Sequence, residues 1–191
     1  CAMAASWHEH HADLDAPSIA VNLSARQLAD ADLTGHVAAA LARSGLPSGS
    51  LVLEMTETAL IEDPGIATER LHELRDLGVQ IAIDDFGTGY SSLSYLRQFP
   101  IDILKIDRSF TAAIGDGSGT PAIVRGVLDL SRTLGLQAIA EGIETTAQLD
   151  AMRAGGCELG QGYLFAAPLP PDEIELLMRC PRQDSNLRHT V

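Results

Sequence analysis

Residues Val79–Asp84 read VQIAID, a short β-branched and apolar run that ends in a carboxylate. A run this short and this apolar is typical of a strand that is buried on both faces of a parallel sheet. It lies between two stretches, Pro64–Leu77 and Ser91–Gln98, in which apolar residues recur at the spacing of a helix. Strands that alternate with helices in this way predict an α/β fold in which helices cover both faces of a parallel sheet.

The same alternation continues on both sides of this segment. Helical spacing recurs in three further stretches, Ala25–Arg43, Pro121–Leu134 and Thr146–Ala154. We expect five further strands, at Ser18–Asn22, Leu51–Glu54, Ile101–Ile106, Leu136–Glu141 and, more weakly, Glu158–Gln161. Six strands and 191 residues fall short of the eight strands and roughly 250 residues of a closed (βα)8 barrel. The pattern therefore predicts a TIM-like barrel that is incomplete at the N-terminus, with Cys1 part-way into the domain.

Almost every expected strand ends in a polar side chain. Because the carboxyl ends of parallel strands lie at one edge of a sheet, we expect these side chains to meet. Any single acid there reads equally well as a helix N-cap. Four carboxylates at one edge, however, repel one another unless cations are bound, and oxygen ligands favour Mg²⁺, Mn²⁺ or Ca²⁺. The residues are Asn22, Glu54, Asp84 with Asp85, Lys105, Glu141 and Gln161.

The composition narrows the class of partner. The chain has 26 acidic and 13 basic residues, a formal net charge of −13, and Lys105 is its only lysine. This acidity argues against a basic surface for DNA, RNA or anionic lipid, but metal ions could still mediate binding of one small phosphate compound. No apolar run approaches the 18 or so residues that span a bilayer. Three widely spaced cysteines, none in a CxxC motif, are expected to be reduced thiols in a cytoplasmic protein.

Six segments carry a family resemblance, in the family's order and spacing. They are NLSARQL (Asn22–Leu28), EMTET (Glu54–Thr58), DDFGTGYSSLSYL (Asp84–Leu96), DILKID (Asp102–Asp107), AEGIE (Ala140–Glu144) and GQGYLFAAPLP (Gly160–Pro170). On these motifs the chain resembles the EAL domain, a bacterial signalling phosphodiesterase with a modified barrel fold that opens cyclic di-GMP. The resemblance covers residues 1–178, and we expect residues 179–191 to be a disordered tail. The Glu-Ala-Leu tripeptide that names the family occurs nowhere in the chain.

The resemblance implies a metal-binding role for four of the strand-end residues. Asn22 and Glu54 match metal ligands of the family. Asp84 matches the carboxylate that bridges two metal ions, and Asp85 matches a ligand of the second ion. The implied cofactor is a pair of Mg²⁺ or Mn²⁺ ions.

The resemblance also implies roles for residues around the metals. Lys105 matches the lysine that contacts the attacking water or the phosphate. Glu141 matches either a general base or a ligand of the second metal, and Gln161 matches a residue that orients water and substrate. Two further acids, Glu57 and Glu144, match residues that support the loop after the paired aspartates.

By resemblance, the reaction is the hydrolysis of cyclic di-GMP to linear pGpG. Two cations that share a carboxylate can lower the pKa of a bound water and hold a phosphate oxygen in line. Arg26, just after the Asn-Leu-Ser turn, is a candidate phosphate contact. One interpretation of the loop Phe86–Leu96 is a plain connection to the next helix, with Ser91 as the N-cap of that helix. The resemblance implies a second interpretation, a loop that couples the metal site to a homodimer contact. We favour the second interpretation.

Two other functions stay open at this point. The missing N-terminal strands, and the missing signature glutamate that is a metal ligand in the family, favour a catalytically inactive EAL-like module that binds cyclic di-GMP or a protein. A third interpretation is a different metal-dependent barrel enzyme that acts on an anionic substrate. Because strand edges would be unpaired and one metal ligand absent, we expect the chain by itself to be poorly stable or to associate, with little activity.

Overall fold

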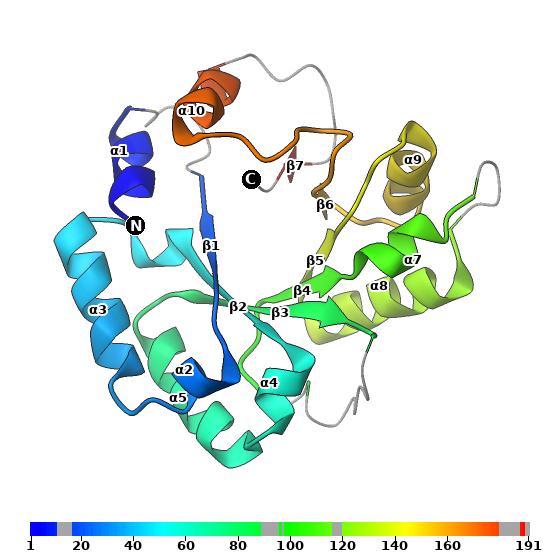
Figure 1. Ribbon diagram of the computed structural model, residues 1–191. Helices are drawn as coiled ribbons and strands as arrows, with labels where there is room; N and C mark the ends of the chain where they lie inside the picture. The colour runs from blue at the N-terminus through cyan, green and yellow to red at the C-terminus, as the bar shows by residue number, and fades with distance from the viewer. Residues whose placement is uncertain (11–16, 89–95, 97, 116–119, 180–187, 190–191) are drawn as a thin grey trace. The chain divides into compact units, whose positions relative to one another are not determined.

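Figure 1 shows the computed structural model of the chain. It describes residues 1–10, 17–88, 96, 98–115, 120–179 and 188–189. These residues form two compact units, Cys1–Leu104 with Leu134–Leu136 and Lys105–Thr133 with Gln137–Val191. Most of the predicted helix at Ser91–Gln98 and most of the predicted tail at 179–191 lie outside the described residues.

The first unit is built on parallel strands covered by helices. Its strands are β1 (Ile19–Asn22), β2 (Leu51–Thr56) and β3 (Gln80–Phe86). Its helices are α1 (Ala2–His10), α2 (Ala25–Leu28), α3 (Leu33–Ser44), α4 (Glu57–Ile61) and α5 (Pro64–Asp76), with a 3-10 turn at Ser48–Ser50. The first five residues of β2 are buried, as expected for a strand covered on both faces. Helix α5 packs against β3 with Leu71 and Leu74 fully buried, and these leucines form part of the core.

The stretch Ala25–Arg43, predicted as one helix, is divided into α2 and α3, so that prediction was wrong. Between the two helices, the Asp30 carboxylate accepts a hydrogen bond from the Asp32 N–H at 3.0 Å. Such a local side-chain bond competes with the helical ladder. Helix α2 begins with a capping box in which Ser24 and Gln27 each accept from the other's backbone N–H. The apolar period continues across the break, which is why periodicity alone misses it.

The second unit repeats the alternation of strand and helix. Strand β4 (Ile103–Ile106) is buried along its whole length and crosses from the first unit into the second. The other strands are β5 (Gln137–Ala140), β6 (Leu159–Gly160) and β7 (Arg188–His189). The helices are α7 (Arg108–Ala112), α8 (Ala122–Leu134), α9 (Thr146–Ala154) and α10 (Pro171–Arg179).

The strand order follows the chain from β1 to β7, and the described pairings are parallel. In the first unit, the Asp102 N–H donates to the Ile81 carbonyl at 3.0 Å and joins the start of β4 to β3. In the second unit, the Glu141 N–H donates to the Ile106 carbonyl at 3.0 Å and joins the end of β4 to the end of β5. The predicted α/β class, an incomplete barrel of parallel strands and helices, is confirmed.

Candidate active site

The register of the first unit puts three predicted site residues on one face of its sheet. Asn22 pairs with Glu54, and Glu54 pairs with Ala82, two residues before Asp84. Paired residues of parallel strands point to the same face, and residues two apart on a strand share a face. Asn22, Glu54 and Asp84 therefore share a face at the carboxyl ends of β1, β2 and β3.

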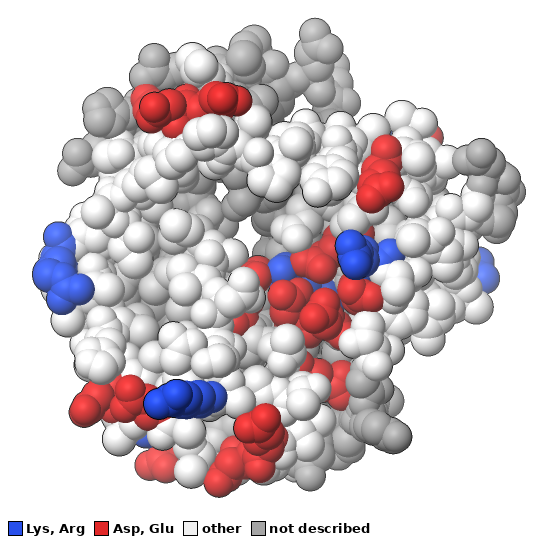
Figure 2. Space-filling model, viewed as in Figure 1, with Lys and Arg blue, Asp and Glu red and all other residues white. Residues whose placement is uncertain are grey.

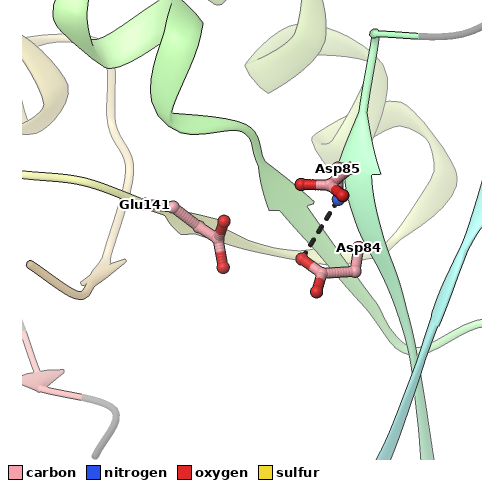
Figure 3. A group of neighbouring side chains, drawn as sticks. All are labelled: Asp84, Asp85 and Glu141. Atoms are coloured by element: carbon pink, nitrogen blue, oxygen red, sulfur yellow. Dashed lines mark hydrogen bonds between the residues drawn. The ribbon is translucent and has the colours of Figure 1, made fainter. Parts of the chain in front are cut away.

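Asp85 departs from the strand geometry that surrounds it. Its φ is 53°, the only positive φ of a non-glycine residue in the described part of the chain. Its N–H donates to the Asp84 carboxylate at 3.0 Å (Figure 3), and its carbonyl accepts from the Thr88 hydroxyl at 2.9 Å. A strict strand would point Asp84 and Asp85 to opposite faces. The left-handed turn at Asp85 breaks that alternation where the chain leaves the sheet.

The donor set of the first unit suits a hard divalent cation. Asn22, Glu54, Asp84 and Asp85 offer only carboxylate and carboxamide oxygens, the ligands that Mg²⁺, Mn²⁺ and Ca²⁺ prefer. Glu54 is buried, with 8% of its surface exposed, whereas Asp84 is half-buried and Asp85 is exposed. The oxygens thus run from the interior to the surface, so an ion could be reached from solvent.

The second unit holds Lys105, Glu141 and Gln161 in direct contact. Lys105 Nζ lies 2.7 Å from Glu141 Oε1, and Gln161 Nε2 donates to the same oxygen at 2.7 Å. The backbone fixes this arrangement, because the Gln161 N–H donates to the Ala140 carbonyl at 2.9 Å. Lys105 is buried, with 4% of its surface exposed. Two donors on one carboxylate oxygen stabilise the ionised form of Glu141, which is also drawn in Figure 3.

The other predicted residues lie next to strand ends. Arg26 is exposed on α2, shortly after β1, and Glu57 is the first residue of α4, directly after β2. Glu144 is exposed, and its N–H donates to Gln148 Oε1 at 2.8 Å. Most of the loop that Glu57 and Glu144 are predicted to support lies outside the described residues, so those two roles stay predictions.

The sequence reasoning missed two residues that cap helices of the second unit. Asp107, after β4, accepts from the Ser109 N–H at 3.0 Å and from the Ser109 hydroxyl. Partial burial raises the pKa of Asp107, but the hydrogen bonds from Ser109 and Arg108, together with the charge of Arg108, hold the pKa below its ordinary value. Gln148 closes a capping box with Thr145 at the start of α9. The sequence does contain a signal for this capping box, because Thr-Thr-Ala-Gln has the required spacing.

Charged side chains of the described residues are unevenly distributed on the face seen in Figure 2. On the side shown in Figure 2, the described acidic side chains are more extensive than the basic ones, which form no broad patch. This agrees with the net charge of −13. Within the described residues, no helix combines the length and the apolar character needed to cross a membrane.

Comparison with known proteins gives a family match over most of the chain. The family model described as "EAL domain" matches residues 1–168. The cyclic di-GMP phosphodiesterase NbdA of Pseudomonas aeruginosa is 44% identical over 167 residues, which make up 87% of this chain and 21% of that protein. The chain spans about a fifth of the length of the curated relatives that it matches.

Solved structures give the same match in three dimensions. The c-di-GMP complex of the phosphodiesterase PaMucR, from the Pseudomonas aeruginosa protein MucR, superposes with a TM-score of 0.82 at 41% identity, covering 91% of this chain and 70% of that chain. Klebsiella pneumoniae BlrP1, in a manganese and cyclic di-GMP complex, superposes with a TM-score of 0.75 at 33% identity. That match covers 87% of this chain and 42% of the BlrP1 chain.

Proposed function

The chain belongs to the EAL domain family, and from this premise we propose that it is the hydrolytic part of a cyclic di-GMP phosphodiesterase. The proposed reaction adds water across one phosphodiester bond of cyclic di-GMP, and the oxygen that leaves phosphorus takes up a proton. The product is linear pGpG. NbdA, a relative with 44% identity, is named as a phosphodiesterase for this compound, which supports the proposal.

The observation that carries the proposal is the shared face of Asn22, Glu54 and Asp84 in the first unit. We propose that these residues, with Asp85, hold divalent cations, either Mg²⁺ or Mn²⁺. Glu141, directly after β5 in the second unit, is proposed as a further ligand. When bound, such ions supply an activated water and offset charge on the phosphate.

The chain's own residues complete the proposed chemistry. Glu141 keeps both of its family roles, general base or metal ligand, in this proposal, and its Oε1 is held in place by Lys105 and Gln161. Lys105 supplies a compact buried positive charge that can orient an attacking water or screen a phosphate oxygen. Gln161, fixed by its bond to Glu141, orients that water through its amide group.

Hydrolysis and binding can be measured separately on the purified chain. We expect pGpG to form from cyclic di-GMP in the presence of Mn²⁺, and formation to stop when EDTA is added. The rate is expected to be low, because the chain lacks the Glu-Ala-Leu glutamate that binds metal in the family. If the chain neither binds nor hydrolyses cyclic di-GMP with Mn²⁺ or Mg²⁺ present, the proposal is contradicted.

A second candidate function follows from the same missing tripeptide. If the remaining ligands hold cations too weakly for turnover, the chain binds cyclic di-GMP without cleaving it. Calorimetric binding with no pGpG after prolonged incubation is the result that would favour this module over the enzyme.

Two further expectations belong to the proposal. Cyclic di-GMP is a bacterial intracellular messenger, so we propose a cytoplasmic location for this domain. We also propose a homodimer formed through the loop after Asp85, most of which lies outside the described residues. Sedimentation equilibrium measures that dimer directly, and a monomer at all concentrations tested would contradict it.

A further inference from the structure

Arg108 is an exposed cation placed directly after the strand that carries Lys105. It is the first residue of α7, three positions beyond Lys105. Within the described part of the chain, Arg108 takes part in no ion pair. Arg26, Arg43 and Arg125 are likewise in no ion pair among the described residues, but of these four arginines only Arg108 directly follows the strand that carries Lys105. Its neighbour Asp107 accepts hydrogen bonds from Ser109, and the charge of Arg108 helps to lower the pKa of that carboxyl without an ion pair between the two side chains.

The stem of Arg108 is packed against the residue that follows Glu141. Gly142 has a φ of 65°, and a Cβ atom placed on it would lie 2.6 Å from Arg108 Cβ and 3.3 Å from Arg108 Cα. Only glycine permits this approach, so the backbone after Glu141 and the start of α7 are held close together. The start of the Arg108 side chain is thus held beside the backbone that follows Glu141, while the residue as a whole is exposed.

The proposed substrate carries two phosphate groups, and only one of them reacts. Lys105 already lies 2.7 Å from Glu141 and is buried, so its charge serves the reacting centre. A second cation in the same unit would offset the charge of the other phosphate, and the planar fork of arginine matches phosphate oxygens in a bidentate manner. We infer that Arg108 binds the phosphate of cyclic di-GMP that is not cleaved, an inference that rests on the proposed function.

The test compares ligands with two phosphates and with one. Binding of cyclic di-GMP and of 3′,5′-cyclic GMP to the 191-residue chain is measured by calorimetry with Mn²⁺ present. Arg108→Ala is expected to weaken cyclic di-GMP binding by about 10- to 100-fold, the usual effect of losing a charged hydrogen bond. The affinity of Arg108→Lys for cyclic di-GMP should lie between those of the wild type and Arg108→Ala, since lysine keeps the charge but lacks the planar guanidinium fork. Cyclic GMP, whose single phosphate occupies the reacting position, should bind almost equally to all of these proteins.

Two controls separate this inference from effects on folding and on total charge. Arg125, exposed on α8 of the same unit, loses the same charge in Arg125→Ala, and this variant should bind cyclic di-GMP like the wild type. Alanine at position 108 keeps the Cβ that contacts Gly142, so the melting temperature should be unchanged. Equal binding of cyclic di-GMP by wild type and Arg108→Ala would overturn the inference and leave the proposed function standing. An equal loss for both ligands would also overturn it, whereas a wild type that binds neither ligand would overturn the proposed function itself.

Discussion

The strand ends of the two units differ in how their acidic charge is balanced. In the first unit, β1, β2 and β3 bring Asn22, Glu54, Asp84 and Asp85 to their carboxyl ends, and none of these side chains is basic. In the second unit, Lys105 and Gln161 both donate to Glu141. The first unit thus offers ligands whose charge suits an added cation, while the second has a cation built into the sequence. The predictions below alter one side of this comparison at a time.

The largest expected effect is the loss of activity on removing one acid from the first unit. Asp84→Asn keeps the shape of the side chain but removes a proposed metal ligand, and we expect the rate of pGpG formation to fall by more than about 100-fold. Asp76→Asn, an exposed acid at the end of α5, is the matched control and should leave the rate unchanged. Equal rates for Asp84→Asn and the wild type would remove Asp84 from the site.

The second effect is a loss of stability on removing the cation from the second unit. Lys105→Met leaves the nearly buried Glu141 carboxylate without its ammonium partner, which typically costs about 3–5 kcal/mol in the free energy of unfolding. The double variant Lys105→Met with Glu141→Gln should recover much of that loss, because no uncompensated charge remains. Urea denaturation measures both, and equal stability of the single and double variants would show that the pair is not coupled.

A smaller effect concerns the backbone at Asp85. Its φ of 53° suits aspartate and asparagine far better than a β-branched residue. The free energy of unfolding of Asp85→Val is expected to be about 1–2 kcal/mol lower than that of Asp85→Asn. Because both variants lose the carboxylate, this difference reports the turn alone. Identical urea midpoints for the two variants would argue against a left-handed residue at this position.

The smallest effect is a pH dependence in the second unit. Despite partial burial, hydrogen bonds from Ser109 and Arg108 and the charge of Arg108 hold the pKa of Asp107 below its ordinary value, with the Ser109 hydroxyl as the largest lowering contribution. A carboxyl group whose pKa is lowered by folding stabilises the protein above its unfolded pKa, and this contribution is lost as the pH falls through the folded pKa. The stability advantage of the wild type over Ser109→Ala should therefore shrink from pH 5 to pH 3. A constant difference across that range would assign the effect of Ser109 to helix capping alone.

Most of the fold could be predicted because short apolar runs and helical periodicity are local features of the sequence. The strand at Val79–Asp84 is an example, although β3 continues through Asp85 to Phe86. Periodicity carries no information about hydrogen bonds from side chains to the backbone, which is why the break at Asp30 was missed. Helix starts such as Thr145 had a readable capping signal.

The candidate site could be predicted as a set of residues but not as a set of contacts. The positions of polar residues at strand ends follow from the topology of a parallel sheet. The shared oxygen of Glu141, which accepts from both Lys105 and Gln161, depends on side-chain conformations and tertiary packing. The same holds for the positive φ of Asp85, since aspartate adopts that conformation only where surrounding contacts, such as those of Thr88, require it.

The most direct test of this account is the dependence of cyclic di-GMP binding on divalent cations. The first unit's carboxylates and the net charge of −13 should repel an anionic nucleotide unless cations are bound. Calorimetric titration of the chain with cyclic di-GMP is predicted to show binding in Mn²⁺ that disappears in EDTA and returns when Mn²⁺ is restored. Binding of equal strength in Mn²⁺ and in EDTA would contradict the claim that these strand-end acids act through metal ions.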